Sequence, residues 1–431
     1  MFILGKKISS FVLCVVIMLS LCCCGKETAE DNALKVDGKR AEKIKAEGSK
    51  ISFIVPGFDG TDKESDYFKA IKELEDTYGK KVKVLSTVGD QTWNQKVAAQ
   101  VASGDPIDVF FVNVEQYLSM YQKGYMRPVD EYIDLENRWH NRSVMDDYVK
   151  FDGKYYAGCV SATPYVMYYN RDLLSANGFD PDEPKNLYND GKWTWDEFKK
   201  IASECSDEDA GITGLENMFD EVFEASNKSG AVKYENGKYL LNIMSEEMRN
   251  TLEMVKDIFA SNPICGSGYV TGQNKFLKGK SVFHGAYAYE DATFTELKAN
   301  GKIKIDYGVT AFPYGPDNSD LVNFGNSTGF AIAKGTDAPY TAGMLIDLIG
   351  KYSTSSSEAK QKNVLKENAK LYKELSENLY IPSYTDGILQ EGYGAFYLLY
   401  YVRQGDDINS VRATYQTEYQ KMIDDANALI K

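Results

Sequence analysis

Histidine, a common residue in catalytic and metal sites, is scarce in this chain, and the usual catalytic motifs are absent. The 431 residues include two histidines, His140 and His284, which are far apart in sequence. No H-E-x-x-H, paired-cysteine, G-x-S-x-G or glycine-rich phosphate-binding motif occurs. The acidic residues show no EF-hand spacing. The sequence therefore predicts no catalytic residue, no metal site and no cofactor.

Cysteine is also too sparse to supply a disulfide framework. Of the seven cysteines, four lie within the first 24 residues, and only Cys159, Cys205 and Cys265 follow. Three widely spaced cysteines do not form a typical disulfide pattern. We expect them to be small buried residues. A single disulfide between two of them is the alternative.

Positive charge is in deficit, which restricts the possible partners. The chain has 49 Lys and Arg against 63 Asp and Glu, a net charge of −14. The phosphates of nucleic acids and the surface of anionic lipids would repel such a protein. We therefore expect no nucleic-acid partner.

Aromatic residues, in contrast, are abundant: 31 Tyr, 20 Phe and 4 Trp. Aromatic faces pack against the C–H faces of sugars, and carboxylates accept hydrogen bonds from sugar hydroxyls. The composition therefore suits a carbohydrate-binding protein.

The N-terminus has the pattern of an export signal. Lys6 and Lys7 precede nine apolar residues, FVLCVVIML, a run too short to span a bilayer comfortably. The following LCCCG resembles the bacterial lipobox, in which Leu stands three residues before a cysteine that becomes lipidated. Leu21 stands three before Cys24, whereas Cys22, the alternative, follows the bulky Leu21 directly. We predict a signal peptide over residues 1–23 and lipidation at Cys24; an uncleaved anchor is the alternative.

Residues 25–50, GKETAEDNALKVDGKRAEKIKAEGSK, are highly charged and nearly free of bulky apolar groups. Such a composition buries too little apolar surface to order itself. We therefore expect a flexible, lipidated tether over residues 24–50. It would hold the protein on the cell membrane, facing the extracytoplasmic side.

The globular part begins with alternating strand and helix patterns. Strand patterns at 51–55, 81–87 and 107–113 alternate with helical spacing over Asp66–Tyr78 and Trp93–Ala102. This order is typical of an α/β fold with a parallel sheet, in which ligands bind beyond the carboxyl ends of the strands. Further on, Pro164 interrupts two extended runs, which indicates a bend or a passage between sheets.

Several motifs, in this order, resemble the extracellular solute-binding proteins of ABC importers, in the family that includes maltose-binding protein. The first is TWNQKVAAQVASGDPIDVFFVNVEQYLSMYQKGYMRPVDEYI; YYNRDLL, YENGKY, FLKGKSVFHGAYAY and IDYGVTAFPYGP follow. Each motif alone is weak, but their order spans residues 51–430. The resemblance implies a periplasmic-binding-protein-like α/β fold of type II, with two lobes joined by a multi-strand hinge that closes on a ligand.

The same resemblance implies a division of the chain. The first lobe would comprise residues 51–160 and 281–326, and the second residues 165–278 and 327–431. Hinge crossings are expected near Ser161–Pro164, Lys278–Ser281 and Asn326–Thr328. The break at Pro164 coincides with the first of these crossings.

Family ligand contacts transfer to matching positions of this sequence. The family's strand-end aromatic matches Val112, which cannot stack, and its hinge acid matches Thr163. Aromatic character persists elsewhere while the polar set changes, which points away from maltose but keeps a carbohydrate ligand. The implied ligand-binding residues are Phe58, Asp59, Asn113, Glu115, Gln116, Thr163, Asn217, Phe219, Tyr287, Tyr289, Tyr393, Phe396 and Tyr397.

Tyr287 is the implied stacking platform for a sugar ring. Because side chains alternate along an extended segment, we expect Tyr287 and Tyr289 on opposite faces, with Tyr289 packed behind. The resemblance implies a monomer that captures an oligosaccharide and delivers it to ABC permease subunits; polyols and glycerophosphodiesters are alternative ligands. A lipid-anchored glycan-acting enzyme and a sensory sugar-binding lipoprotein are the alternative functions.

Overall fold

The chain folds into two compact units. In the computed structural model, the first unit comprises Met1–Thr163 and Asn326–Lys362, and the second comprises Pro164–Gly325 and Asn363–Lys431. The structure describes residues 34, 36–85, 97, 99–100, 103, 107–260, 275–318, 323–361, 364, 366–377, 379–389 and 394–430. The signal peptide, Cys24 and Cys265 lie outside the described residues.

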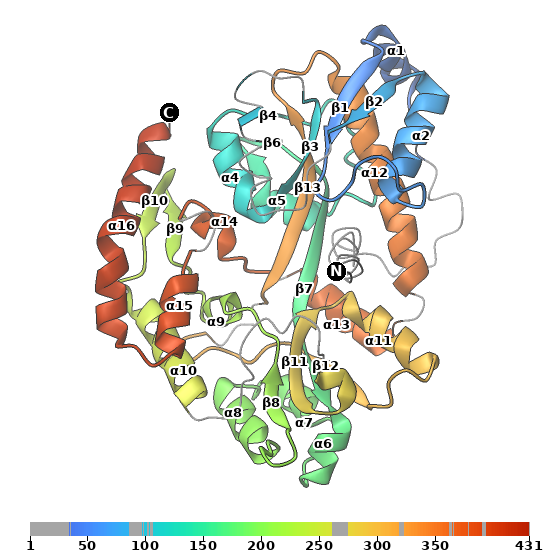
Figure 1. The fold of residues 1–431 in the computed structure, drawn as a ribbon. Coiled ribbons are helices and arrows are strands. Elements are labelled where there is room, and N and C mark those ends of the chain that lie inside the picture. The colour runs from blue at the N-terminus through green and yellow to red at the C-terminus, as the bar shows by residue number, and fades with distance from the viewer. Residues whose placement is uncertain are drawn as a thin grey trace, which may run out of the picture. The chain divides into compact units, whose positions relative to one another are not determined.

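The first unit is built on a mixed sheet with strand order β2-β1-β3-β13-β7 (Figure 1). β1 is parallel to β2 and β3, whereas β13 is antiparallel to β3 and also pairs with β4. A short hairpin of β5 and β6 lies apart from this sheet. The strands are β1 (Lys50–Ile54), β2 (Lys81–Val84), β3 (Val109–Asn113), β4 (Met126–Arg127), β5 (Lys150–Phe151), β6 (Lys154–Tyr155), β7 (Gly158–Asn170) and β13 (Gly325–Ala333).

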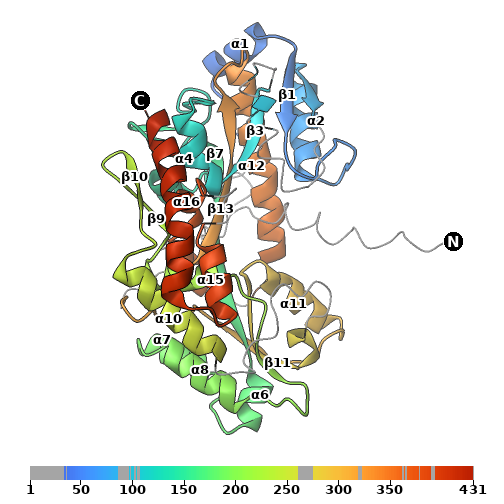
Figure 2. The same ribbon diagram turned by 60° about the vertical axis from the view of Figure 1, so that its left-hand side comes forward.

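Helices cover this sheet, and their sequences explain where they begin and end. The helix predicted over Asp66–Tyr78 is confirmed as α2: the Ser65 side chain accepts a hydrogen bond from the Tyr67 N–H, and Gly79 ends the helix in the left-handed conformation. α2 packs against α12 (Figure 2). Within the described residues, the helices of this unit are α1 (Gly38–Ala46), α2 (Asp66–Tyr78), α4 (Val114–Gln122), α5 (Arg142–Tyr148) and α12 (Pro339–Gln361).

The expectation of a flexible tether is wrong for residues 36–50, because α1 packs onto the first unit. Ile44 is fully buried, and Arg40 forms an ion pair with buried Asp347. The Glu47 carboxylate accepts the N–H groups of Tyr340 and Thr341 at the start of α12. One apolar residue and a few charged residues with specific partners therefore order a segment whose composition alone indicates disorder. The rest of the predicted tether lies outside the described residues, apart from Leu34.

The second unit contains the remainder of β7, which pairs with β11 and β12; β8 pairs with the other edge of β11. β11 is antiparallel to β7 and parallel to β8. β9 and β10 form a separate hairpin. The additional strands are β8 (Thr213–Glu216), β9 (Val232–Glu235), β10 (Lys238–Leu241), β11 (Ser281–Tyr287) and β12 (Tyr307–Thr310).

The helices of the second unit surround these strands (Figures 1 and 2). In the described part of the chain, no helix combines the length and apolar composition needed to cross a bilayer. The helices are α6 (Arg171–Ala176), α7 (Glu183–Asn189), α8 (Trp195–Glu204), α9 (Glu221–Asn227), α10 (Glu246–Ala260), the 3-10 helix η3 (Phe276–Lys278), α11 (Glu290–Ala299), α13 (Lys366–Ser376), α14 (Ser383–Asp386), α15 (Phe396–Arg403) and α16 (Ile408–Leu429).

The division into units differs from the expected lobes. Residues 281–325 belong to the second unit because β11 pairs with β7 and β8, and β12 pairs with β7. Residues 326–362 belong to the first unit because β13 pairs with β3 and α12 packs on α2. The chain passes between units after Thr163, before Asn326 and after Lys362, whereas Lys278–Ser281 lies wholly within the second unit.

The expectation that the cysteines are small buried residues is confirmed for Cys159 and Cys205. Both are free thiols, and at most 2% of either residue is exposed. Burial raises the pKa of each thiol, to about 11 for Cys205.

Candidate functional site

Most of the candidate ligand-binding residues follow the carboxyl ends of parallel strands, and they do so separately in each unit. In the first unit, β1 and β3 run parallel; Phe58 and Asp59 come after β1, Asn113 ends β3, and Glu115 and Gln116 follow it. In the second unit, β8 and β11 run parallel, and Asn217, Phe219 and Tyr289 come after them. These sheet edges are where α/β folds bind ligands.

Aromatic rings gather at the second-unit edge. Phe219, Tyr287 and Tyr289 are half-buried, and we call these three residues the aromatic platform. The ring centroids of Phe219 and Tyr287 are 5.9 Å apart, and those of Tyr287 and Tyr289 are 5.6 Å apart. Half-buried rings in mutual contact offer the apolar surface on which a sugar ring can stack.

Three buried rings support the aromatic platform from below: Tyr165, Phe312 and Phe324. The Tyr165 and Phe312 rings are stacked, with an interplanar angle of 3° and centroids 5.5 Å apart. Tyr165 also contacts Tyr287 edge-on at 5.0 Å, and its hydroxyl donates to the Gly285 carbonyl oxygen at 2.7 Å. Tyr165 therefore holds strand β11 through the Gly285 carbonyl and positions the Tyr287 ring through the ring contact.

The expectation that Tyr287 and Tyr289 lie on opposite faces is wrong. Their rings stack with an interplanar angle of 16°. β11 ends at Tyr287, and Tyr289 is the N-cap of α11 with φ −68° and ψ −18°, so strand alternation stops between them. The Tyr168 hydroxyl donates to the Tyr287 carbonyl at 3.2 Å, and the Ala288 N–H donates to the Pro164 carbonyl at 3.0 Å. These contacts hold the turn that carries both rings.

Asn217 orders the edge through contacts with Gly285. Its side-chain amide donates to the Gly285 carbonyl at 2.9 Å, and its own carbonyl accepts the Gly285 N–H at 2.8 Å. The residue adopts φ 55°, a left-handed conformation that asparagine tolerates. A Cβ at Gly285 would lie 2.6 Å from the Asn217 carbonyl oxygen, so this close approach requires glycine. Asn217 is therefore placed to position the edge.

At the first-unit edge, the residues after β3 form the start of α4. The Asn113 N–H donates to Gln116 Oε1 at 3.3 Å in a capping-box arrangement. Asn113 Nδ2 lies 3.5 Å from Glu115 Oε2. Burial raises the pKa of Glu115 to about 7, although the Asn113 contact lowers it. Near neutral pH this carboxyl can therefore donate or accept a hydrogen bond.

The remaining first-unit candidates are engaged within the protein. Phe58 is 5% exposed and its ring packs against Tyr67, with centroids 5.4 Å apart. The Asp59 carboxylate accepts the Thr61 N–H and hydroxyl at 2.9 and 2.6 Å, contacts that lower its pKa. Thr163 is 3% exposed on β7. In this conformation Phe58 serves the core, and Asp59 orders its own loop.

The candidates near the C-terminus belong to a different aromatic cluster. Phe396 stacks on Tyr400 within α15, and Tyr397 stacks on Tyr415 of α16. Both Phe396 and Tyr397 are half-buried. Tyr393 lies outside the described residues. Tyr397 therefore takes part in the packing of α15 on α16, whereas the Phe396 ring contacts rings of its own helix.

Sequence reasoning missed the rings beneath the aromatic platform. Tyr165 directly follows Pro164, the position where a passage between sheets was expected, and this was the one available signal. Phe312 and Phe324 carry no motif of their own. Their role follows from tertiary packing, which no local pattern encodes.

Two α/β units with ligand-competent residues at the carboxyl ends of parallel strands define the periplasmic-binding-protein-like class, and solved structures of that class share the fold. Residues 69–364 match the model of the bacterial extracellular solute-binding protein family, so the chain belongs to that family. The family consists of substrate-binding proteins, and membership implies an extracytoplasmic location.

Individual relatives are more distant. The galactooligosaccharide-binding protein of Bacillus subtilis is 26% identical over 341 residues, covering 74% of this chain and 71% of the relative. An ABC substrate-binding protein from Listeria monocytogenes, solved with cycloalternan, has a TM-score of 0.63 and 16% identity over 88% of this chain and 98% of its own. A Mycobacterium tuberculosis protein solved with glycerophosphocholine has a TM-score of 0.65 and 16% identity, covering 88% and 99%.

Proposed function

We propose that this protein captures an uncharged oligosaccharide outside the cytoplasm and delivers it to the permease of an ABC importer. The aromatic platform carries this proposal, because three half-buried rings in contact suit the apolar faces of a sugar. The galactooligosaccharide-binding relative supports the same ligand class. We further propose that the protein is a monomer without enzymatic activity, held on the membrane by lipid at Cys24.

The charge of the candidate residues favours a neutral ligand over a phosphodiester. Among the described candidate ligand-binding residues, Asp59 and Glu115 bear carboxyl groups, and none of these candidates bears a positive charge. A phosphate would be repelled by ionised carboxylates and would find no cationic donor among these residues. The phosphate of glycerophosphocholine, the ligand of one structural neighbour, would therefore be disfavoured beside these residues.

Capture requires a change in conformation under this proposal. Two units joined by β7 and by the chain entering β13 give a hinge at Thr163–Pro164 and Gly325–Asn326. A ligand that binds both units would shift the population toward a closed form. Small-angle scattering should then show a smaller radius of gyration in saturating ligand.

A panel of glycans separates this proposal from its alternatives. Thermal melts with galactooligosaccharides, cycloalternan and glycerophosphocholine should show stabilisation by a neutral glycan and none by the phosphodiester. The glycan should be recovered intact after incubation; its hydrolysis would establish a glycan-acting enzyme instead. Sugar binding without import by cells expressing the adjoining permease would favour the sensory alternative.

A further inference from the structure

His284 lies on β11, the strand that ends at Tyr287 of the aromatic platform, and faces two carboxylates. It is three residues before Tyr287 on β11, and its side chain is 5% exposed. Glu216 Oε2 lies 3.7 Å from His284 Nδ1, and Glu290 Oε2 lies 4.0 Å from His284 Nε2. Among the described residues, neither ring nitrogen has a hydrogen-bond partner. A buried imidazole with an acid at each nitrogen is suited to hold a proton.

Glu216 is the fixed member of this group. Its two carboxylate oxygens accept the N–H groups of Lys275 and Phe276, each at 2.7 Å. Burial raises the pKa of Glu216, but the interaction with His284 and the two N–H donors outweigh burial, and the net effect lowers the pKa. Glu216 therefore stays ionised and cannot move without breaking both backbone hydrogen bonds.

Glu290 is the movable member. Its side chain is 31% exposed, and it lies in the first turn of α11, immediately after Tyr289. Tyr289 in turn stacks on Tyr287. A shift of Glu290 toward solvent would therefore displace half of a stacked pair in the aromatic platform.

The other groups around His284 do not compete for its proton. The rings of Phe276, Phe294 and Tyr168 have centroids 5.3, 6.0 and 6.2 Å from that of His284. Burial raises the pKa of Tyr168 far above its ordinary value, so its hydroxyl stays neutral. Among the described residues, no group of three histidine, cysteine or acidic side chains could hold a metal ion.

Asp291, the acidic neighbour of Glu290, is occupied by other partners. Its carboxylate accepts hydrogen bonds from the Tyr307 hydroxyl at 2.7 Å and from Asn368 and Tyr372 at 2.8 Å each. These donors are neutral, and they tie α11 to β12 and α13. The Glu290–His284 contact, in contrast, depends on the charge of an imidazole.

The balance around His284 favours its charged form. Burial lowers the pKa of His284, but Glu216 and Glu290 raise it by more, so the net pKa lies above the ordinary value. A histidine whose pKa is raised in the folded state contributes stability that is fully present below its unfolded pKa and is lost as pH rises through its folded pKa. The contact with Glu290 should weaken over the same range.

We propose that His284 is a positioning residue whose protonation couples pH to ligand capture: the imidazolium holds Glu290, and thereby keeps Tyr289 stacked on Tyr287. Deprotonation removes this attraction, and the start of α11 loosens. This inference rests on the proposed function of the aromatic platform. By linkage, bound ligand must in turn make His284 harder to deprotonate.

Nuclear magnetic resonance of the histidine rings tests the first step without any ligand. The full chain has only His140 and His284, so the signal lost in His284→Gln identifies the residue. The His284 pKa should be lower in Glu290→Gln than in the parent. Glu296→Gln, which removes an exposed charge from the same helix, should leave it unchanged. An unchanged pKa in Glu290→Gln would overturn the proposal.

Hydrogen exchange and binding test the second step. Corrected for intrinsic rates, exchange of the backbone N–H groups of residues 287–291 should rise as His284 deprotonates in the parent. In Glu290→Gln it should be fast throughout. With a galactooligosaccharide as the probe, affinity should weaken about fivefold over the same pH range, and Glu290→Gln should show no such change. Exchange in Glu290→Gln that still follows the titration of His284 would overturn the proposal.

Failure of the proposed function and failure of the pH coupling give different results. If the probe and all other neutral glycans fail to bind at any pH, the proposed function falls, while the titration and exchange results still decide the role of His284. If a glycan binds with equal affinity across the titration of His284, the proposed function stands and the coupling is refuted.

Discussion

Arg40 of α1 and Asp347 of α12 form an ion pair, with Nη1 and Oδ2 2.7 Å apart. The Asp347 side chain is fully buried and also accepts hydrogen bonds from His140 and Trp139. Burial raises the pKa of Asp347, but His140 and Arg40 outweigh burial, and the net effect lowers it. The pair attaches the N-terminal helix to the core of the first unit, so α1 belongs to the fold.

Arg40→Ala should lower the free energy of unfolding of the first unit by about 3 kcal/mol, because it leaves a buried carboxylate short of its cation. Urea unfolding is the measurement. Lys72→Ala, which removes an exposed pair with Asp76, should leave the free energy of unfolding close to that of the parent. Equal losses in the two variants would show that α1 contributes nothing specific.

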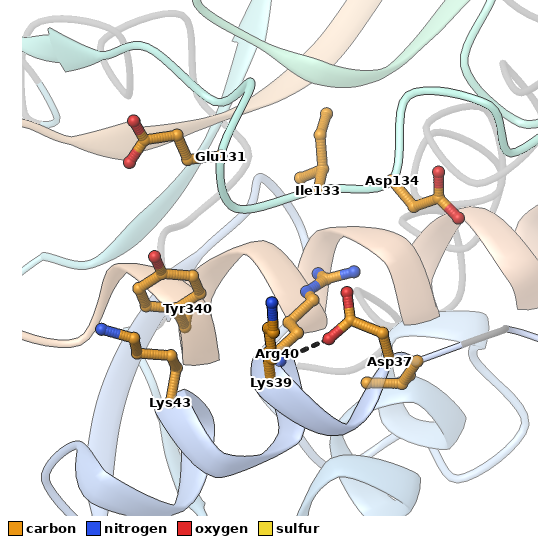
Figure 3. A pocket seen from close by; sticks show the side chains of 9 residues that line it. Asp37, Lys39, Arg40, Lys43, Glu131, Ile133, Asp134 and Tyr340 are labelled. Atoms are coloured by element: carbon orange, nitrogen blue, oxygen red, sulfur yellow. Dashed lines mark hydrogen bonds between the residues drawn. The ribbon is translucent and has the colours of Figure 1, made fainter.

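A surface cavity lies beside α1, and α1 forms part of its lining. It has a volume of about 850 Å³ and is lined by residues of α1, of the segment 131–134 and of α12 (Figure 3). Lys43 lies over the Tyr340 ring, 5.8 Å from its centroid. The segment that contains α1 therefore forms one wall of this cavity. Because the Arg40–Asp347 pair attaches α1, hydrogen exchange of the α1 backbone N–H groups should be slow in the parent and fast in Arg40→Ala.

Glu115→Gln should increase stability at alkaline pH. The pKa of Glu115 is raised to about 7, so the folded state holds its proton more tightly than the unfolded state, and stability falls as pH rises from about 4.5 to 7. Because the residue is only half-buried, we expect a gain of about 1–2 kcal/mol at pH 8 and little at pH 4.5. Urea unfolding at both pH values measures this difference.

Glu131→Gln is the control for Glu115, because Glu131 is exposed in the same unit. It should change stability by less than about 0.5 kcal/mol at either pH. A gain at pH 8 that Glu131→Gln matches would mean that overall charge, and not the burial of Glu115, is responsible.

Asp291→Ala should destabilise the second unit by about 3 kcal/mol or more. The substitution would leave three buried donors, on Tyr307, Asn368 and Tyr372, without their common acceptor. Glu296→Ala on the exposed face of α11 should stay within about 0.5 kcal/mol of the parent. Thermal melts decide between these outcomes, and a mild effect of Asp291→Ala would show that the donors find water.

Lipidation at Cys24 is testable by mass spectrometry of the protein isolated from membranes. We expect a mature chain that begins at an acylated Cys24, because Leu21 stands three residues before it. Cys24→Ser should release the protein from the membrane, since stable anchoring needs the attached acyl chains. A mature start beyond residue 30, or an intact Met1, would contradict the prediction.

The sequence revealed the fold class and some elements accurately because the relevant forces are local. The helix Asp66–Tyr78 was predictable from its apolar spacing, and the structure adds only its Ser65 and Gly79 caps. The ordering of α1 was not predictable, because it depends on partners such as Asp347, some 300 positions away in sequence. The predicted division into lobes was wrong for the same reason. Strand partners, and not the order of motifs in the sequence, decide to which unit β11 and β13 belong.

The candidate site divides in the same way. Positions at or just after strand ends, such as Tyr287 and Asn217, could be identified because strand ends are visible in a sequence. The orientation of a ring could not: Phe58 turned into the core, and Tyr289 stacked on Tyr287 once the helix start broke the alternation. The buried rings beneath them, and the contact of His284 with Glu216, appear only when the sheet brings distant segments together.

Calorimetry of Tyr287→Ala with the glycan identified by the panel tests the central claim most directly. Loss of a stacking ring should weaken binding by about 1–3 kcal/mol, or roughly tenfold to more than a hundredfold. Tyr289→Ala should weaken binding similarly, because its ring is equally half-buried and stacks on Tyr287. Tyr234→Ala, on the separate β9–β10 hairpin of the same unit, should bind like the parent. If Tyr287→Ala also binds like the parent, or melts far lower while binding normally, the aromatic platform is not the ligand site.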